Sequence, residues 1–153
     1  MKTIEILVGI PCSGKSTYCN KYLLNFEVNV LSRDTLRLFM FGDNYKQNNK
    51  SETLLSEIFN KQLITQLSDS FYNTIILDNT HCKEKYIDEI IMKYSVEHNI
   101  RIKFFDIPLY KAHYRNIIRY FKTGKWIPIK IMNNMYKNYN KINKKKYEKY
   151  MVY

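Results

Sequence analysis

The sequence has no long apolar segment, few glycines and prolines, and no paired cysteines. None of its apolar runs approaches the roughly 18 residues of a membrane-spanning helix, so we expect no membrane segment. The 4 Gly and 3 Pro among 153 residues exclude collagen-like and low-complexity chains. The 3 cysteines lack paired spacing, which predicts free thiols in a reducing compartment. We therefore expect a cytoplasmic protein, in the host cell if it is viral.

Acidic residues are scarce in the last third of the chain. Residues 1–100 carry 11 Lys and Arg against 12 Asp and Glu, whereas residues 101–153 carry 14 Lys and Arg against Asp106 and Glu148 alone. The formal net charge of +11 therefore lies almost entirely in the last third. Such a field attracts polyanions, although a chain rich in Lys, Asn, Ile and Tyr also arises from an AT-rich genome.

The basic C-terminal segment, about residues 128–153, also contains several aromatic rings. Its alternating residues are Tyr139, Lys141, Lys144, Lys145, Lys146, Tyr147, Lys149 and Tyr150. This pattern suits a phosphate backbone whose bases stack on the rings. It suits a solvated helix end equally well, and both interpretations stay open.

Short apolar strands alternate with amphipathic helices along the chain. Strands are predicted at residues 3–8, 28–31, 74–77 and 100–105. Helices are predicted at 15–24, 32–41, from 51, 83–98, 110–121 and from 128, and a polar loop at 42–50. The helix that begins at Ser51 is expected to bury one stripe, namely Leu54, Leu55, Ile58, Phe59, Leu63, Ile64 and Leu67. This alternation predicts one α/β domain over residues 1–153, with a central parallel sheet of about four strands and helices on both faces.

Polar residues follow the end of each predicted strand. They are Gly9, residues 32–34, residues 78–81 and residues 106–108. Because ligands of such sheets bind beyond the carboxyl ends of the strands, we expect these four stretches to meet at one edge.

Residues 9–16 have the pattern of a phosphate-binding loop. They read Gly-Ile-Pro-Cys-Ser-Gly-Lys-Ser and match G-x-x-x-x-G-K-[ST] between a strand and a helix. Glycines let backbone amides point at phosphates, and the helix N-terminus adds positive charge. We expect Lys15 to contact the β- and γ-phosphates of ATP and Ser16 to bind Mg²⁺. The residues expected to bind ATP here are Gly9, Pro11, Cys12, Ser13, Gly14, Lys15, Ser16 and Thr17.

The residues after the third predicted strand help to choose among phosphate-loop proteins. That strand ends in Asp78, a position from which a carboxylate steadies Mg²⁺, directly or through water. The next residue is Asn79, whereas a motor ATPase commonly has a carboxylate there to activate water. The N-K-x-D segment of GTPases is absent. Transfer of phosphate to an acceptor is therefore favoured over hydrolysis.

Asp34 is the best candidate for the base that such a transfer needs. It follows the second predicted strand, across the expected site from the phosphate loop, where a carboxylate would take the proton of an acceptor hydroxyl. Arg37 lies three residues further on the same helix face and would hold an acceptor phosphate. The alternatives are a simple helix N-cap for Asp34 and surface charges for Arg33 and Arg37.

A basic segment after the fourth predicted strand has the features of a lid. Arg115 and Arg119 are four residues apart on one predicted helix, so both side chains can point the same way. Gly124 offers a hinge between Lys122 and Lys125. A transferring phosphoryl group needs positive charge in its transition state, so we expect a lid over about residues 111–127 that brings both arginines to ATP. The alternative is a basic surface helix.

Four blocks of the sequence carry a resemblance to a known family. They are the loop at 6–17, Ser32-Arg33-Asp34-Thr35-Leu36-Arg37, Asp78-Asn79-Thr80-His81, and a lid region with Phe105-Asp106-Ile107-Pro108, Arg115-Asn116-Ile117-Ile118-Arg119 and Ile127-Pro128-Ile129. In this order they resemble the 5′-hydroxyl polynucleotide kinases of the phage T4 type, over about residues 1–140. The resemblance implies a P-loop kinase fold with an arginine-bearing helical lid. Two positions depart from it, since Cys12 replaces a usual Gly and Tyr120 replaces a small residue.

The resemblance also implies an activity and a set of roles. The activity is ATP-dependent transfer of the γ-phosphate to the 5′-hydroxyl end of DNA or RNA in end repair, with ATP and Mg²⁺ as cofactors and a ligase as a functional partner. No D-x-D-x-T phosphatase motif is present. The alternatives are a kinase for a nucleoside, sugar or toxin-type substrate, and a non-catalytic, ATP-gated nucleic-acid-binding module. The implied roles are catalysis by Lys15, Asp34 and Arg119, ATP binding by Arg115 and Arg119, acceptor binding by Asp34, Arg37, Asn79 and Thr80, and Mg²⁺ binding by Ser16 and Asp78.

Overall fold

The structure, a computed structural model, describes residues 1–42 and 48–152 and alternates strands with helices. Its elements are β1 (Thr3–Val8), α1 (Lys15–Asn20), β2 (Val28–Ser32), α2 (Arg33–Phe41), α3 (Asn49–Ser68), β3 (Thr74–Asp78), α4 (Glu84–Tyr94), β4 (Asn99–Phe104), α5 (Leu109–Thr123), α6 (Ile129–Asn140) and the 3-10 helix η1 (Lys144–Tyr150). The four predicted strands are confirmed. The predicted loop at 42–50 lies largely outside the described residues.

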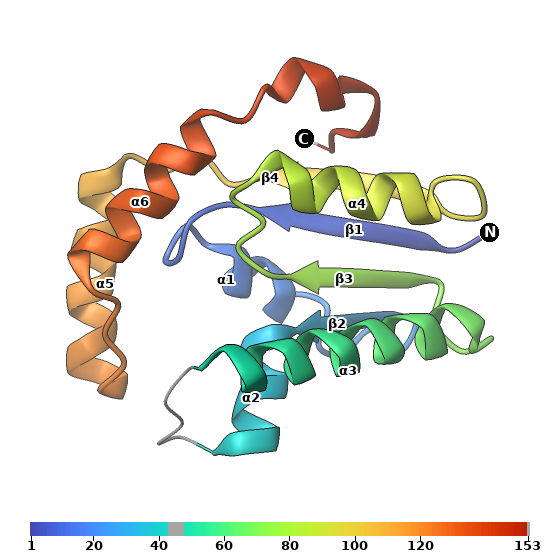
Figure 1. The fold of residues 1–153 in the computed structure, drawn as a ribbon, viewed down its shortest axis with the longest axis horizontal. Helices are drawn as coiled ribbons and strands as arrows, with labels where there is room; N and C mark the ends of the chain where they lie inside the picture. Colours follow the sequence, from blue (N-terminus) through green and yellow to red (C-terminus); the bar gives the residue numbers. More distant parts are fainter. Residues whose placement is uncertain (43–47, 153) are drawn as a thin grey trace.

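The strands form one parallel sheet in the order β2-β3-β1-β4. The first strand pairs with both β3 and β4, and Ile4 lies beside Ile75 and Ile100. Figure 1 shows α3 and α4 in front of the sheet and α1 behind it. The predicted α/β fold with helices on both faces is confirmed. The strand arrows point toward α5 and α6, which therefore stand at the carboxyl edge where a ligand is expected (Figure 1).

The larger core lies between the sheet and the pair α3 and α4. Side chains alternate between the faces of a strand, so Ile4, Ile6 and Val8 join this core while Leu7 joins a smaller one under α1. The stripe predicted on α3 is confirmed for its buried members, which are Leu55, Phe59 and Leu63. It is wrong for Leu54 and Ile64, which are exposed because the face of α3 that meets the sheet is narrower than the stripe.

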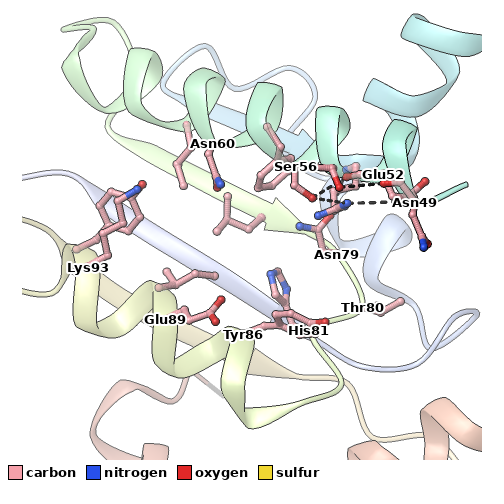
Figure 2. Close-up of a pocket in the computed structure, with 17 residues that line it drawn as sticks. Asn49, Glu52, Ser56, Asn60, Asn79, Thr80, His81, Tyr86, Glu89 and Lys93 are labelled. Carbon is pink, nitrogen blue, oxygen red and sulfur yellow. Dashed lines mark hydrogen bonds and ion pairs between the residues drawn. The ribbon is translucent and has the colours of Figure 1, made fainter.

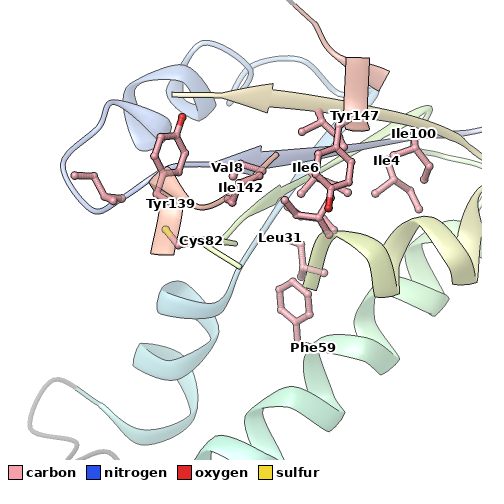
Figure 3. Packing of buried hydrophobic residues seen from close by; sticks show 14 of the residues in the cluster. Ile4, Ile6, Val8, Leu31, Phe59, Cys82, Ile100, Tyr139, Ile142 and Tyr147 are labelled. Atoms are coloured by element: carbon pink, nitrogen blue, oxygen red, sulfur yellow. The ribbon is translucent and has the colours of Figure 1, made fainter. Parts of the chain in front are cut away.

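The C-terminal segment is part of this core. Figure 3 shows Tyr139, Ile142 and Tyr147 packed against the sheet face that carries Ile6 and Val8. Tyr139 and Tyr147 are 4% and 1% exposed. Neither ring can stack on a base, so the expectation of stacking platforms is wrong for these two residues, and so is that of a solvated helix end.

Acidic side chains anchor the same segment. The hydroxyl of Tyr139 donates to Asp106 at 2.7 Å, and that of Tyr147 donates to Asp88 at 2.9 Å. Lys144 pairs with Asp106, and Lys146 pairs with Asp88. Part of the positive charge of the tail is thus neutralised within the protein. No helix in the described part of the chain is long and apolar enough to cross a membrane.

Candidate active site

The phosphate loop connects β1 to α1 and encloses the Lys15 side chain. Gly14, with φ 109°, has the left-handed conformation that glycine adopts without a steric penalty. Cys12 has φ 62°, which is uncommon for a residue with a Cβ, and it occupies the position where the resembled family has Gly. Lys15 is buried, and its Nζ donates to the carbonyls of Gly9 and Ile10, both at 2.8 Å.

Burial and the neighbouring opposite charge shift the pKa values of Lys15 and Asp78, the two charged residues of the expected phosphate site. Burial lowers the pKa of Lys15, and the Asp78 carboxylate opposes that shift. Burial likewise raises the pKa of Asp78, and Lys15 opposes that shift. The Asp34 carboxylate acts on both groups. Lys15, Asp34 and Asp78 come from three segments of the sequence that stand at the carboxyl ends of β1, β2 and β3, which pair in parallel and so end at one edge of the sheet.

The residues expected to hold Mg²⁺ are compatible with that ion. Ser16 is exposed at the start of α1, and Asp78 ends β3, so both present oxygen donors at the carboxyl edge. Within residues 1–42 and 48–152 no group of three or more His, Cys, Asp or Glu side chains is placed to hold a metal. Mg²⁺ in phosphotransferases is usually held by one or two protein oxygens together with substrate phosphates and water. The hydroxyl and the carboxylate fit that need.

Gly9 allows the loop to pass close to the segment after β4. A Cβ at this position would lie 2.8 Å from Ser13 Oγ, 2.9 Å from the Phe105 Cβ and 3.2 Å from the Phe105 carbonyl oxygen. We therefore expect Gly9→Ala to lower the free energy of unfolding by about 1–3 kcal/mol, as overpacking does, and to weaken ATP binding. Urea denaturation and ATP titration measure the two effects. An unchanged unfolding midpoint would contradict the predicted clash.

The acceptor side of the site is built on α2. Ser32 is the N-cap of this helix, and its Oγ accepts a bond from the Thr35 backbone N–H. The alternative that Asp34 is the N-cap is therefore wrong. The Asp34 side chain is 87% exposed and pairs with Arg37, which is 18% exposed. Asp34 thus presents a solvent-accessible carboxylate that an adjacent guanidinium orients.

Glu52 of α3 holds both arginines and was not identified from the sequence. Its carboxylate accepts two bonds from Arg37, from Nε at 3.0 Å and from Nη2 at 3.1 Å. Arg33 Nη2 lies 3.3 Å from the same carboxylate and 3.0 Å from Ser56 Oγ. The bonds from Arg37 are the largest cause of a lowered pKa for Glu52. Glu52 therefore stays ionised and fixes the fork of Arg37.

Asn79 and Thr80 lie between the phosphate loop and α2. Asn79 Oδ1 accepts a bond from the Arg33 backbone N–H at 3.1 Å, and the Thr80 carbonyl accepts one from the Gly9 N–H at 3.2 Å. Their predicted contact with the acceptor stays a prediction. The bonds that they make show that they also join the two halves of the site.

A groove of about 710 Å³ runs from this point between α3 and α4. Figure 2 shows Glu52, Ser56 and Asn60 on the wall formed by α3, and Tyr86 and Glu89 on the wall formed by α4. Asn79, Thr80 and His81 line it as well (Figure 2).

His81 is buried in this groove and was not identified as a site residue from the sequence. Its Nδ1 lies 3.1 Å from the Leu7 carbonyl, so Nδ1 carries the hydrogen of this bond. Burial is the largest cause of the fall of its pKa to about 4. The ring is therefore neutral near pH 7 and does not add charge to the site.

The predicted lid corresponds to α5 and the loop that follows it. Arg115 Nη1 donates to the Cys12 carbonyl at 3.2 Å, which places α5 against the phosphate loop. Arg119 lies one turn further along α5 and is partly buried. In the described chain its guanidinium has no hydrogen bond or ion pair with another side chain. Arg115 thus contacts the phosphate loop, whereas the guanidinium of Arg119 is available to bind a ligand.

Asn116, between the two arginines, fixes the end of the lid. It is fully buried, its amide donates to the Ile127 carbonyl at 2.8 Å, and its Oδ1 accepts from the Ile127 N–H at 3.3 Å. The R-N-x-x-R spacing contains this residue, but no local signal shows that its partner lies eleven positions later. The hinge expected at Gly124 has φ 70° and ends α5.

Comparisons with known proteins identify the family. Residues 4–141 match the family model AAA_33, which describes an AAA domain. A chain of the Pnkp1/Rnl/Hen1 RNA repair complex has 26% identity and a TM-score of 0.82 over 94% of this chain and 46% of its own length. A chain in a second structure, of the Pnkp1/Rnl/Hen1 complex, has 26% identity and a TM-score of 0.66. The match covers 74% of this chain and 38% of that chain. This chain thus spans less than half the length of these relatives.

A gluconokinase from Sinorhizobium meliloti 1021 is also similar in structure. Its identity is 13% and its TM-score 0.60, over 99% of this chain and 80% of the gluconokinase. At that identity the similarity shows the shared fold alone. The chain thus has the fold of P-loop kinase structures, and because the family match covers residues 4–141, it belongs to the AAA_33 family.

Proposed function

We propose that the protein transfers the γ-phosphate of ATP to the 5′-hydroxyl end of a polynucleotide. The observation that carries this proposal is the Asp34–Arg37 pair, which Glu52 orients at the same edge of the sheet as the phosphate loop. A carboxylate beside a fixed guanidinium suits an acceptor that carries both a hydroxyl and a phosphate. The similarity to a chain of an RNA repair complex supports the same acceptor class.

On the donor side the protein supplies positive charge. Lys15 is held inside the loop, where it would contact the β- and γ-phosphates. Arg115 is held at the Cys12 carbonyl, and Arg119 has no competing partner among the described residues, so it is free to meet the charge that develops on the transferring group. Mg²⁺, when bound by Ser16 and Asp78, would neutralise phosphate charge.

On the acceptor side Asp34 takes the proton of the attacking hydroxyl. The hydroxyl oxygen forms a bond to the γ-phosphorus as the bond to the β,γ-bridging oxygen breaks, and ADP leaves with the bonding electrons. Arg37 binds a phosphate of the acceptor and so sets the distance between Asp34 and the hydroxyl. The exposure of Asp34 leaves room for a chain end.

The proposed role is repair of nucleic-acid ends, with a ligase as the partner that uses the 5′-phosphate. A ligase needs a 5′-phosphate end, which this reaction would supply. The similarity to a chain that assembles in an RNA repair complex supports this placement.

The direct test follows labelled γ-phosphate. ATP and Mg²⁺ are incubated with 5′-hydroxyl DNA and RNA single strands, and with 5′-phosphorylated strands, a nucleoside and gluconate as controls. We expect label on the 5′-hydroxyl strands alone. Label on a small molecule but not on the strands would support a small-molecule kinase. ATP binding without any transfer would support a non-catalytic module.

Glu52→Gln tests how the acceptor anchor is positioned. Hydrogen bonds between charged groups contribute about 1.5–3 kcal/mol each, so loosening Arg37 should raise the KM for the oligonucleotide by about tenfold or more. The KM for ATP should stay within about twofold. Steady-state kinetics with each substrate varied in turn measures the difference.

Glu57→Gln is the matched control, because Glu57 is an exposed carboxylate on the same helix. Equal effects of Glu52→Gln on the KM of both substrates would show that Glu52 stabilises the fold and does not position Arg37.

A further inference from the structure

The lid carries more exposed aromatic surface than its packing requires. Along α5 and the loop after it, Tyr114 is 65% exposed, Tyr120 49%, Phe121 82% and Trp126 43%. Tyr120 contacts both Phe121 and Trp126, with ring centroids 5.8 Å and 6.0 Å apart. We call these four residues the lid aromatic surface. The fully buried residues of α5 are Ala112 and Asn116. Tyr120 packs on Trp126 of the following loop, whereas Tyr114 and Phe121 remain largely exposed.

The same segment is strongly basic. Residues 109–131 contain six Lys and Arg and no Asp or Glu. Lys122 and Lys125 are exposed and alternate with Phe121 and Trp126. In the tail, by contrast, Lys144 and Lys146 pair with acidic residues of the protein. Lys141, Lys145 and Lys149 of the tail remain exposed, so the lid is one of two basic regions, and it is the one whose helix contacts the phosphate loop.

We infer that the lid aromatic surface stacks the unpaired bases of a single-stranded nucleic acid whose 5′ end is the phosphate acceptor. Exposed rings alternating with cations match what single strands require, since each base offers a face for stacking and each phosphate a negative charge. Arg115 of the same helix contacts the phosphate loop, so we expect a strand on the lid to run toward the site of transfer. This inference rests on the proposed polynucleotide acceptor.

Other occupants fit the surface less well. A second copy of the lid would bring six further cations against these six, and like charges repel. A duplex exposes only the outer face of its terminal base pair, so it offers one stacking surface where a single strand offers several. An anionic lipid surface also attracts basic aromatic helices, but it would not explain why the surface adjoins the phosphate loop.

Trp126 provides a direct probe, because it is the single tryptophan of the protein. Its fluorescence is recorded while a 5′-hydroxyl 12-nucleotide single strand, the matching duplex, ATP alone and vesicles of anionic phospholipid are added in separate titrations. We expect quenching by the single strand at the lowest concentration. Phe121→Ala should raise the Kd of the strand by about tenfold or more, as the loss of one stacked base does.

Phe26→Ala is the matched control, because Phe26 is 80% exposed and precedes β2, at the amino end of the sheet. It should leave the Kd unchanged. Replacing Lys122 and Lys125 by Gln should reduce the slope of log Kd against log salt by about 1.4, since each phosphate contact on a single strand contributes about 0.7.

Three results would overturn the inference: quenching by ATP or vesicles but not by the strand, equal effects of Phe26→Ala and Phe121→Ala, or no quenching. The transfer assay is run on the same preparation. If the strand receives labelled phosphate but the fluorescence of Trp126 does not change, the stacking surface is refuted and the proposed kinase activity stands. If the strand quenches Trp126 and Phe121→Ala raises its Kd, but no labelled phosphate is transferred, the stacking surface is supported and the kinase activity is refuted.

Discussion

Changing Asp34 to Asn is expected to lower kcat for transfer to a 5′-hydroxyl strand by about 10²–10⁴-fold, the usual contribution of a positioned general base. The amide keeps the shape of the side chain but cannot accept the proton. The affinity for ATP should change little, because Lys15, the residue proposed to hold the phosphates, lies in the phosphate loop and not on α2. Single-turnover transfer with labelled ATP, together with ATP titration, measures both quantities.

The stability of the Asp34→Asn variant separates a catalytic from a structural role. Asp34 is 87% exposed, and Ser32 caps the helix in its place. Surface substitutions of this kind change stability by about 0.5 kcal/mol or less. Glu27→Gln is a suitable control, since Glu27 is an exposed carboxylate at the opposite end of β2. A variant that transfers phosphate at nearly the wild-type rate would show that Asp34 is not the base.

The strands and the phosphate loop could be predicted because their signals are local. Apolar runs of a few residues and the G-x-x-x-x-G-K-[ST] spacing lie within short windows of the chain. Parallel packing then brings the carboxyl ends of the strands to one edge, so the segments that carry Lys15, Asp34 and Asp78 lie at that edge without any further information. The same short stretches of sequence therefore predict both the fold and the position of the site.

The partners of the site residues could not be predicted, since they are distant in sequence. Glu52 lies fifteen positions after Arg37 and belongs to another helix, so no periodic pattern connects them. Tyr147 reaches Asp88 across a separation of 59 residues. An alternation of Lys and Tyr is the same whether its rings are buried or exposed, so the burial of Tyr139 and Tyr147 could not be predicted from the sequence.

Cys12 stands at a usual glycine position of the phosphate loop, and the structure shows the conformation that this position requires. The sequence shows only that a usual glycine is missing. In the structure this residue has φ 62°, and its carbonyl accepts the bond from Arg115. The loop thus keeps a conformation that glycine adopts more easily, and the lid contacts its backbone there.

Arg119→Ala is expected to lower kcat by about 10³–10⁵-fold, the range found for arginines that stabilise a transferring phosphoryl group. Because this side chain has no hydrogen bond or ion pair with another side chain in the described chain, its removal should leave the unfolding midpoint almost unchanged. Arg119→Lys should recover a small part of the rate, since a point charge replaces a fork of donors.

Arg115→Ala provides the comparison that assigns the two lid arginines. Arg115 donates to the Cys12 carbonyl, so its loss should raise the KM for ATP by loosening the lid, with a smaller fall in kcat. Arg101→Ala, an exposed arginine on β4, controls for loss of net charge. Steady-state kinetics on the three variants gives the answer. A large fall in kcat for Arg115→Ala and none for Arg119→Ala would exchange the two roles.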